Sequence, residues 1–227
     1  MVTAIFPAAG QSRRMHSKTN KNFLQIKDQP ILIHTLKKFS KSDKIDKLII
    51  AAAPDEVEIV KEMLKKITGL KPFQVVAGGS ERQYSIANAL EFIDDDSEVI
   101  LVHDAARPMV TVKTIDKVVD MAKLHGAAIA AVKEKNTIKI VDDNDFVIDT
   151  PPRSTLVSVQ TPQGFRREII LKAYEQAKIE NFLGTDDSSL VERLGYKVKI
   201  VQSDYKNIKL TTPEDIIIAE AFLKEEV

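Results

Sequence analysis

The 227-residue chain contains no cysteine, no tryptophan and no long apolar run. Without cysteine, disulfides, thiolate catalysis and cysteine-ligated zinc are excluded. No segment approaches the roughly 18 consecutive apolar residues that a transmembrane helix needs. The N-terminus also lacks the basic flank and cleavage site of a signal peptide. We therefore expect a soluble, cytoplasmic protein.

The chain also lacks an excess of charge of either sign, because 33 Lys and Arg residues balance 33 Asp and Glu residues. A general binder of nucleic acid or of an anionic membrane needs a basic excess, so neither partner is expected. A local basic site is still compatible with this balance. The length fits one large domain spanning 1–227, and the hydrophobic content of 44% is enough to fill its core.

Short apolar runs alternate with amphipathic stretches along most of the chain. This order predicts an α/β fold with a doubly wound, mostly parallel, Rossmann-like sheet and helices on both faces. One helix is expected to begin near Asp55, and Ser80 with Gln83 fits a capping box for another. Thr212 is predicted as the N-cap of the last helix, with Pro213 in its first turn. The predicted strands cover 4–6, 48–52, 73–76, 99–102, 127–132 and 197–201, and further helices cover 114–124 and 167–178.

The segment at about 133–160 interrupts this alternation. Residues 137–141 alternate in polarity, Asp142–Asp145 signals a turn, and 146–148 is apolar again. This pattern predicts an inserted β-hairpin arm. Because an isolated hairpin is marginally stable in water, we expect it to pack on a second subunit. An exposed flap on a monomer is the alternative.

The first loop carries the strongest signal for a ligand. It follows the first predicted strand and runs from Pro7 to Met15, with Lys21 shortly after it. Its small residues let a ligand approach the backbone N–H groups, while Arg14 and Lys21 add positive charge for a polyphosphate. The loop lacks the spacing of a Walker A motif, and its single glycine does not make a dinucleotide fingerprint. A basic strand-to-helix turn is the alternative interpretation.

Two further loops are predicted at the same sheet edge, because ligands bind at the carboxyl ends of parallel strands. Gly78-Gly79-Ser80 follows one strand, and His103-Asp104 follows the next. Asp104 can hold a divalent cation or a ribose hydroxyl, and Arg107 can reach an anion. A local salt bridge between these two residues is the alternative.

Later polar segments are less specific. Lys209 lies between apolar neighbours and either points toward a buried phosphate or lies on an exposed face. The segments 161–163 and 184–187 are read as loops before helices, which suit phosphate contacts. For Asp186 and Asp187 ordinary helix capping is favoured. His103 is interpreted as structural, because no catalytic triad or metal-ligand spacing accompanies it.

Cations outnumber plausible general bases among these candidates, which favours phosphoryl or nucleotidyl transfer. The motifs also occur in a familiar order. The chain resembles, over nearly its whole length, the 2-C-methyl-D-erythritol 4-phosphate cytidylyltransferase family of the non-mevalonate isoprenoid pathway. It departs from the family pattern at Ser80 and Asn136, where aspartate is common. The segments that carry the resemblance are 7–10 with Arg14 and Lys21, 78–82, 103–108, 160–163 and 207–209.

The resemblance implies a magnesium-dependent transferase that joins CTP to 2-C-methyl-D-erythritol 4-phosphate. It also implies a homodimer in which the arm reaches the partner's site. Arg14 and Lys21 would be catalytic, stabilising charge on the triphosphate, and Asp104 would help to position the metal. The nucleotide would be bound by Ala8, Ala9, Gly10, Gly79, Ser80, Ser85, Asp104 and Ala105. The acceptor would be held by Arg107, Thr137, Arg153, Thr161, Thr185 and Lys209, with Thr137 and Arg153 supplied by the partner.

Two alternatives to this function are considered. Ribitol-5-phosphate cytidylyltransferases share the fold, CTP and most of the motifs. Ala105-Ala106 and the segment 185–190 resemble the methylerythritol enzymes more closely. A catalytically silent nucleotide-binding module is the second alternative. It would need a cytosine pocket but not the charges of Arg14, Lys21 and Lys209.

Overall fold

The computed structural model describes residues 1–10 and 21–225. Within them no helix is long and apolar enough to cross a membrane. The elements are β1 (Val2–Pro7), η2 (Lys21–Phe23), β2 (Gln25–Ile26), β3 (Gln29–Pro30), α1 (Ile31–Ser40), β4 (Lys47–Ala52), α2 (Val57–Lys65), β5 (Phe73–Ala77), α3 (Arg82–Leu90), β6 (Val99–Val102), α4 (Val112–His125), β7 (Ala127–Lys133), β8 (Ile140–Val141), β9 (Val147–Asp149), η3 (Arg153–Thr155), β10 (Val157–Arg166), α5 (Arg167–Ile179), α6 (Asp187–Arg193), β11 (Lys199–Gln202) and α7 (Pro213–Glu225).

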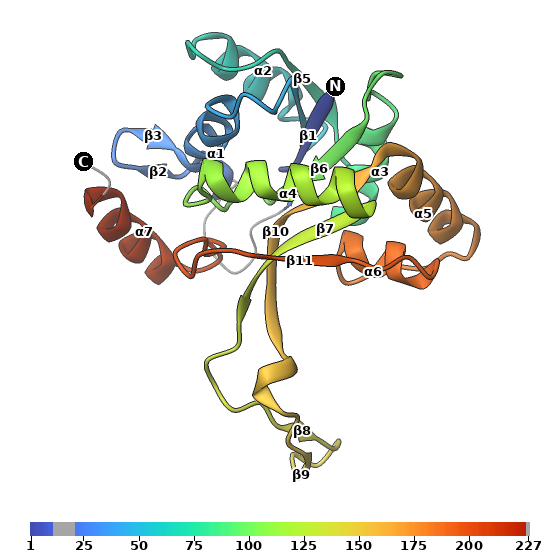
Figure 1. Cartoon of the computed structure of the whole chain (residues 1–227). Coiled ribbons are helices and arrows are strands. Elements are labelled where there is room, and N and C mark those ends of the chain that lie inside the picture. Colours follow the sequence, from blue (N-terminus) through green and yellow to red (C-terminus); the bar gives the residue numbers. More distant parts are fainter. Residues whose placement is uncertain (11–20, 226–227) are drawn as a thin grey trace.

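A seven-stranded sheet forms the centre of the fold, in the order β11-β7-β10-β6-β1-β4-β5 (Figure 1). Its pairs are parallel except for those of β10, which runs antiparallel to both β6 and β7. The central strands are buried on both faces, which explains why they are continuous apolar runs rather than alternating ones. The predicted mostly parallel sheet is therefore confirmed.

Helices cover both faces of the sheet. Alternate strand residues point to opposite faces, so Ala4 and Phe6 of β1 pack with α1, α2 and α4. Ile5 of the same strand packs on the other side, in a cluster with α3, α5 and α6. A third cluster joins β2 and α7 around Ile26, Met109 and Leu210. This distribution of helices makes the sheet doubly wound, as predicted.

The parallel strands β1, β4, β5 and β6 end at one common edge. There the chain after β1 stays beside β4, since the N–H of Ala8 donates to the carbonyl of Ala51 at 2.8 Å. The N–H of Gly78, after β5, donates to the carbonyl of Ala52 at 2.7 Å. The loops after β1, β5 and β6 therefore lie along the same edge, as the sequence predicts.

The segment 161–163 is not the predicted loop, because it lies inside the ten-residue strand β10. Pro162 and Gly164 favour a loop locally, but the slot between β6 and β7 imposes an extended backbone. The register with β7 shifts between Val159 and Gln163, and the Thr161–Pro162 peptide is cis. Gly164 lets α4 approach the strand, because a Cβ there would lie 2.9 Å from Cγ1 of Val118.

The predicted capping box at Ser80 is also wrong. Helix α3 begins at Arg82, and its N-cap, Glu81, makes no side-chain cap hydrogen bond. The Gln83 side chain instead bridges to the loop before α6, donating to the carbonyl of Phe182 at 2.9 Å and accepting from the N–H of Gly184 at 2.8 Å. This tertiary contact uses the amide that a capping box would need. Pro213 does open α7, directly after Thr212.

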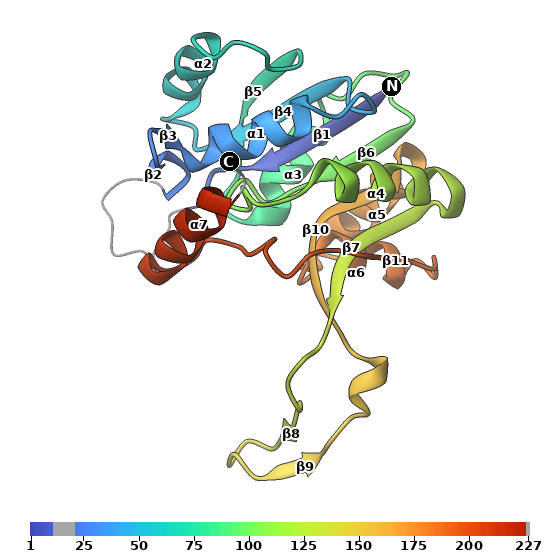
Figure 2. The ribbon, with the colours of Figure 1, turned by 60° about the vertical axis from the view of Figure 1, so that its left-hand side comes forward.

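The predicted arm extends away from the sheet as a hairpin of β8 and β9, beyond the ends of β7 and β10 (Figures 1 and 2). Strand β8 is shorter than the predicted 137–141, whereas β9 has the predicted length and is displaced by one residue from 146–148. At its turn, the Asp142 carboxylate accepts from the N–H groups of Asn144 and Phe146, at 3.0 and 2.9 Å. Large apolar side chains remain exposed on it, including Phe146 at 71% and Ile148 at 65%.

Candidate functional site

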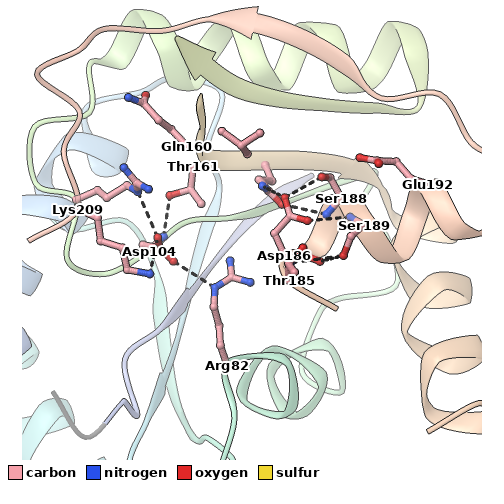
Figure 3. Close-up of a pocket in the computed structure, with 13 residues that line it drawn as sticks. Arg82, Asp104, Gln160, Thr161, Thr185, Asp186, Ser188, Ser189, Glu192 and Lys209 are labelled. Carbon is pink, nitrogen blue, oxygen red and sulfur yellow. Dashed lines mark hydrogen bonds and ion pairs between the residues drawn. The ribbon is translucent and has the colours of Figure 1, made fainter. Parts of the chain in front are cut away.

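A cavity of about 480 Å³ opens beside residues 159–163 of β10 and the loop that follows β6 (Figure 3). Lys209 and Asp104 lie on one side of it, Asp186 lies on the other, and Arg82 reaches in from α3. Four predicted acceptor residues, Arg107, Thr161, Thr185 and Lys209, are therefore brought together with Asp104. The lining residues are Arg82, Asp104, Arg107, Val159, Gln160, Thr161, Gln163, Thr185, Asp186, Ser188, Ser189, Glu192 and Lys209.

Three cationic side chains converge on the carboxylate of Asp104. Nε of Arg82 lies 3.2 Å from Oδ1, while Oδ2 accepts from Nε of Arg107 at 3.2 Å and from Nζ of Lys209 at 3.1 Å. The local pair between Asp104 and Arg107, considered above as an alternative, is thus one part of a larger cluster. Asp104 is only 6% exposed. Its burial alone would raise the pKa of the carboxyl, but the three cations outweigh burial and hold that pKa well below its usual range.

The backbone at Asp104 is fixed from behind by His103 and Thr161. Nε2 of His103 lies 3.2 Å from the carbonyl of Arg107, so this nitrogen carries the hydrogen. Nδ1 then accepts from the Thr161 hydroxyl at 3.1 Å, and that hydroxyl accepts from the N–H of Asp104 at 3.0 Å. Burial lowers the pKa of His103 to about 3, which keeps the ring neutral. The structural role predicted for His103 is confirmed.

Lys209 reaches the cavity because its neighbours anchor the loop before α7. Leu210 is fully buried, and its N–H donates to the carbonyl of Ala106 at 2.9 Å. The side-chain amide of Asn207 donates to the carbonyl of Thr161 at 2.9 Å, and the carbonyl of Asn207 accepts from Arg107 at 2.8 Å. The apolar neighbours thus settle the alternative left open above: Lys209 points toward Asp104.

Sequence reasoning missed Arg82 and Asp187. The guanidinium of Arg82 joins Asp104 to Asp187, whose Oδ2 lies 2.7 Å from Arg82 NH2. The helix-capping interpretation holds for Asp186, which forms a capping box with Ser189. It is wrong for Asp187, whose side chain is 1% exposed and also accepts from the Tyr174 hydroxyl at 2.6 Å. The adjacent Asp186-Asp187 pair was the available signal, because only one of two successive carboxylates can be the N-cap.

The residues predicted to bind nucleotide lie along the same sheet edge. A Cβ on Gly78 would approach Cβ of Ala9 to 2.7 Å and Oγ of Ser85 to 2.9 Å, so the loops after β1 and β5 meet there. Oγ of Ser85 accepts from the N–H of Gly79 and donates to the carbonyl of Glu81, both at 3.0 Å. This hydroxyl therefore shapes the loop.

The other predicted nucleotide residues differ in exposure. Gly10 and Ser80 are exposed, while Ala8 and Ala105 are buried and present backbone. Arg14 lies outside the described residues, as does the side chain of Lys21, whose backbone begins η2. Their predicted catalytic roles stay predictions.

The arm residues do not reach the cavity of their own chain. Thr137 and Arg153 are both exposed on the arm, and neither lines the cavity that the described residues form. Nη1 of Arg153 donates instead to the carbonyl of Lys135 at 2.9 Å. Their predicted position in a partner's site stays a prediction.

Three carboxylates line the cavity, those of Asp104, Asp186 and Glu192, and Asp104 is the one predicted to position a magnesium ion. Among the described residues no group of three His, Asp or Glu side chains converges. Mg²⁺ commonly uses one or two carboxylates together with substrate phosphates and water. Asp104 therefore fits an ion that arrives with a polyphosphate, but only if one of its cationic partners gives way.

The doubly wound sheet, with Arg82, Arg107 and Lys209 gathered in a pocket at its carboxyl edge, is typical of α/β proteins that bind phosphorylated ligands. Comparison with known proteins narrows this class. The family model for 2-C-methyl-D-erythritol 4-phosphate cytidylyltransferase matches residues 2–225. The chain belongs to this family.

Individual relatives agree. The enzymes of that name from Caldanaerobacter subterraneus subsp. tengcongensis and Bacillus cytotoxicus are 47% and 48% identical, covering 99% and 98% of both chains. The crystal structure of 4-diphosphocytidyl-2C-methyl-D-erythritol synthase from Anaerococcus prevotii has a TM-score of 0.88 at 35% identity. The two structures match over 98% of the present chain and 96% of the Anaerococcus prevotii chain.

Proposed function

We propose that the chain transfers the cytidylyl group of CTP to 2-C-methyl-D-erythritol 4-phosphate. A phosphate oxygen of the acceptor attacks the α-phosphorus of CTP, the bond to the β-phosphate breaks, and pyrophosphate leaves. The products are 4-diphosphocytidyl-2-C-methyl-D-erythritol and pyrophosphate. The chain acts as one nucleotidyltransferase domain, with its arm at about 133–160. Its cytoplasmic location remains a prediction.

The cluster of Arg107 and Lys209 around Asp104 carries this proposal, together with membership of the family. Attacking and leaving groups are both anionic, so bringing them together needs positive charge rather than a strong base. Arg107 and Lys209 bind the acceptor phosphate, which takes the place of the Asp104 carboxylate as their counter-ion. Asp104 then turns to the nucleotide side. Arg14 and Lys21 stabilise charge on the triphosphate.

Mg²⁺ is proposed as the cofactor, with Asp104 as its protein ligand. When bound, the ion neutralises charge on the phosphates of CTP. The exposed apolar side chains of the arm support a homodimer in which Thr137 and Arg153 complete the partner's acceptor site.

Pyrophosphate release tests the proposal. CTP and Mg²⁺ are supplied with either 2-C-methyl-D-erythritol 4-phosphate or ribitol 5-phosphate, and we expect turnover with the first alone. Turnover with ribitol 5-phosphate alone would keep the nucleotide chemistry and overturn the acceptor. Silence with both, alongside measurable CTP binding, would favour a nucleotide-binding module.

A further inference from the structure

A line of hydrogen bonds leads from the interior of the helical layer to the cavity. The Tyr174 hydroxyl on α5 donates to Oδ1 of Asp187, which opens α6, at 2.6 Å. Oδ2 of Asp187 accepts from Nη2 of Arg82 on α3 at 2.7 Å. Nε of the same guanidinium donates to Oδ1 of Asp104 at 3.2 Å. Residues of three helices are thereby linked in series to the carboxylate that follows β6, and Arg82 alone of the three contacts it.

The inner members of this line cannot touch a ligand in the 480 Å³ cavity. Tyr174 is 7% exposed and the Asp187 side chain 1%; both line a smaller neighbouring cavity of about 200 Å³, and neither lines the 480 Å³ cavity. The Arg82 side chain is 29% exposed and does line it. Arg82 lines both cavities, and its guanidinium is the group through which Tyr174 and Asp187 connect to Asp104.

The guanidinium is held from two directions. It is planar and donates along fixed axes, so contacts at Nε and Nη2 together set its orientation. Burial alone would lower the pKa of Arg82, but the carboxylates of Asp187 and Asp104 outweigh burial and raise it. Burial and the Asp187 carboxylate also raise the pKa of Tyr174, so its hydroxyl remains a donor. Without Asp187, only Asp104 would direct the guanidinium among these contacts.

We propose that Tyr174 and Asp187 are positioning residues, which orient the Asp104 carboxylate through Arg82. This inference rests on the proposed function, in which Asp104 serves the nucleotide and its metal ion. It predicts that the hydroxyl of Tyr174, which does not line the 480 Å³ cavity, affects the use of CTP more than the use of the acceptor.

Tyr174→Phe tests the proposal, because it removes the hydroxyl and keeps the ring. We expect kcat/KM for CTP to fall about tenfold while KM for the acceptor stays within about threefold. In the Asp104→Asn background the same change should cost less than about threefold, because the group on which it acts has gone. Asp187→Asn, which keeps the side-chain size, should behave in the same way.

Arg193→Gln is the matched control. It removes an ion pair from the same helix α6, that of Nε with Glu180 at 2.7 Å, and should leave kcat/KM within about twofold. Two results would overturn the proposal: Tyr174→Phe as active as Arg193→Gln, or an equal loss in both Asp104 backgrounds. The second result would mean a purely structural role.

The test also separates this inference from the proposed function. If the wild-type protein releases no pyrophosphate with either acceptor, the proposed function fails. The same variants are then compared by their affinity for CTP in the presence of Mg²⁺, measured by calorimetry. The positioning role is supported if Tyr174→Phe weakens CTP binding about tenfold in the wild-type background but not in the Asp104→Asn background. Unchanged CTP binding in Tyr174→Phe overturns it.

Discussion

Asp104 acts as an internal counter-ion for the cations that line the pocket. Its two oxygens accept from Arg82, Arg107 and Lys209, which would otherwise repel one another at close range. A dianionic phosphate can replace this single negative charge at Arg107 and Lys209. The pocket is thereby expected to favour a phosphate over a neutral or singly charged ligand.

Lys209→Met should weaken binding of the acceptor more than that of CTP. The change keeps the length of the side chain and removes its charge, so the acceptor phosphate loses one charge-assisted contact. We expect KM for the acceptor to rise about tenfold or more, with KM for CTP within about threefold, in initial-rate measurements. Lys206→Met is the control, because Nζ of Lys206 lies over the ring of Phe222. A rise confined to KM for CTP would contradict this prediction.

His103 should make stability depend on pH. Burial lowers its pKa to about 3, whereas an unfolded histidine titrates near 6.5. Between these values the unfolded chain binds a proton that the folded chain does not, so stability falls as the pH drops. We expect the free energy of unfolding to decrease by about 2 kcal/mol from pH 7 to pH 5 through this residue, measured by chemical denaturation.

The control for this prediction compares slopes rather than absolute stabilities. His103→Asn should remove most of the decrease between pH 7 and pH 5. His125→Asn, at the exposed end of α4, should keep it. An unchanged pH slope in His103→Asn would show that other groups dominate.

At the scale of elements, two glycines serve different contacts of the sheet. Gly78 separates the loops after β1 and β5, where a Cβ would lie 2.7 Å from that of Ala9. Gly164 lies in the buried part of β10, where a Cβ would lie 2.7 Å from Cδ2 of Leu101. Gly78→Ala should therefore disturb the predicted nucleotide loops. Gly164→Ala should overpack the core.

Each of the two variants serves as the control for the other. We expect Gly78→Ala to raise KM for CTP about tenfold, and Gly164→Ala to lower the free energy of unfolding by about 1–3 kcal/mol. Steady-state kinetics and chemical denaturation should separate the two effects. The interpretation fails if Gly164→Ala changes KM for CTP as much as Gly78→Ala does.

At the scale of the whole molecule, the question is whether the active unit is one chain or two, and this depends on which site the arm serves. If the arm completes the partner's pocket, as proposed, Arg153 and Lys209 of one chain belong to different sites of the dimer. Arg153→Ala and Lys209→Met should each keep about a tenth or less of wild-type activity when assayed alone, at an acceptor concentration below KM. After mixing and subunit exchange, each heterodimer should contain one intact site and one doubly defective site.

Random exchange makes about half of the dimers heterodimers, with half of their sites intact. We therefore expect about a quarter of wild-type activity on mixing, against about a tenth or less for either variant alone. The assay is pyrophosphate release before and after exchange. No recovery, with exchange demonstrated by mass spectrometry, would place Arg153 outside the partner's site.

The sequence predicts the site most reliably where the candidate residues lie in loops whose position follows from the order of the strands. The loops after β1, β5 and β6 were placed at one edge because parallel strands share their carboxyl ends. Strand β10 was not predicted at 161–163 because Pro162 and Gly164 favour a loop locally. Pairing with β6 and β7 outweighs this local preference. Arg82 and Asp187 were missed because they meet through tertiary packing, 105 positions apart.

The sequence by itself determined the alternation of buried strands and helices, the arm and the order of the charged motifs, since hydrophobic period and turn residues are local properties. Only the tertiary structure decided which charges face each other. It turned Lys209 toward Asp104, gave Asp186 and Asp187 different roles, and used the Gln83 amide across the fold. The physical reason is that a buried charge must find its partner in space, and that distance is not encoded by spacing along the chain.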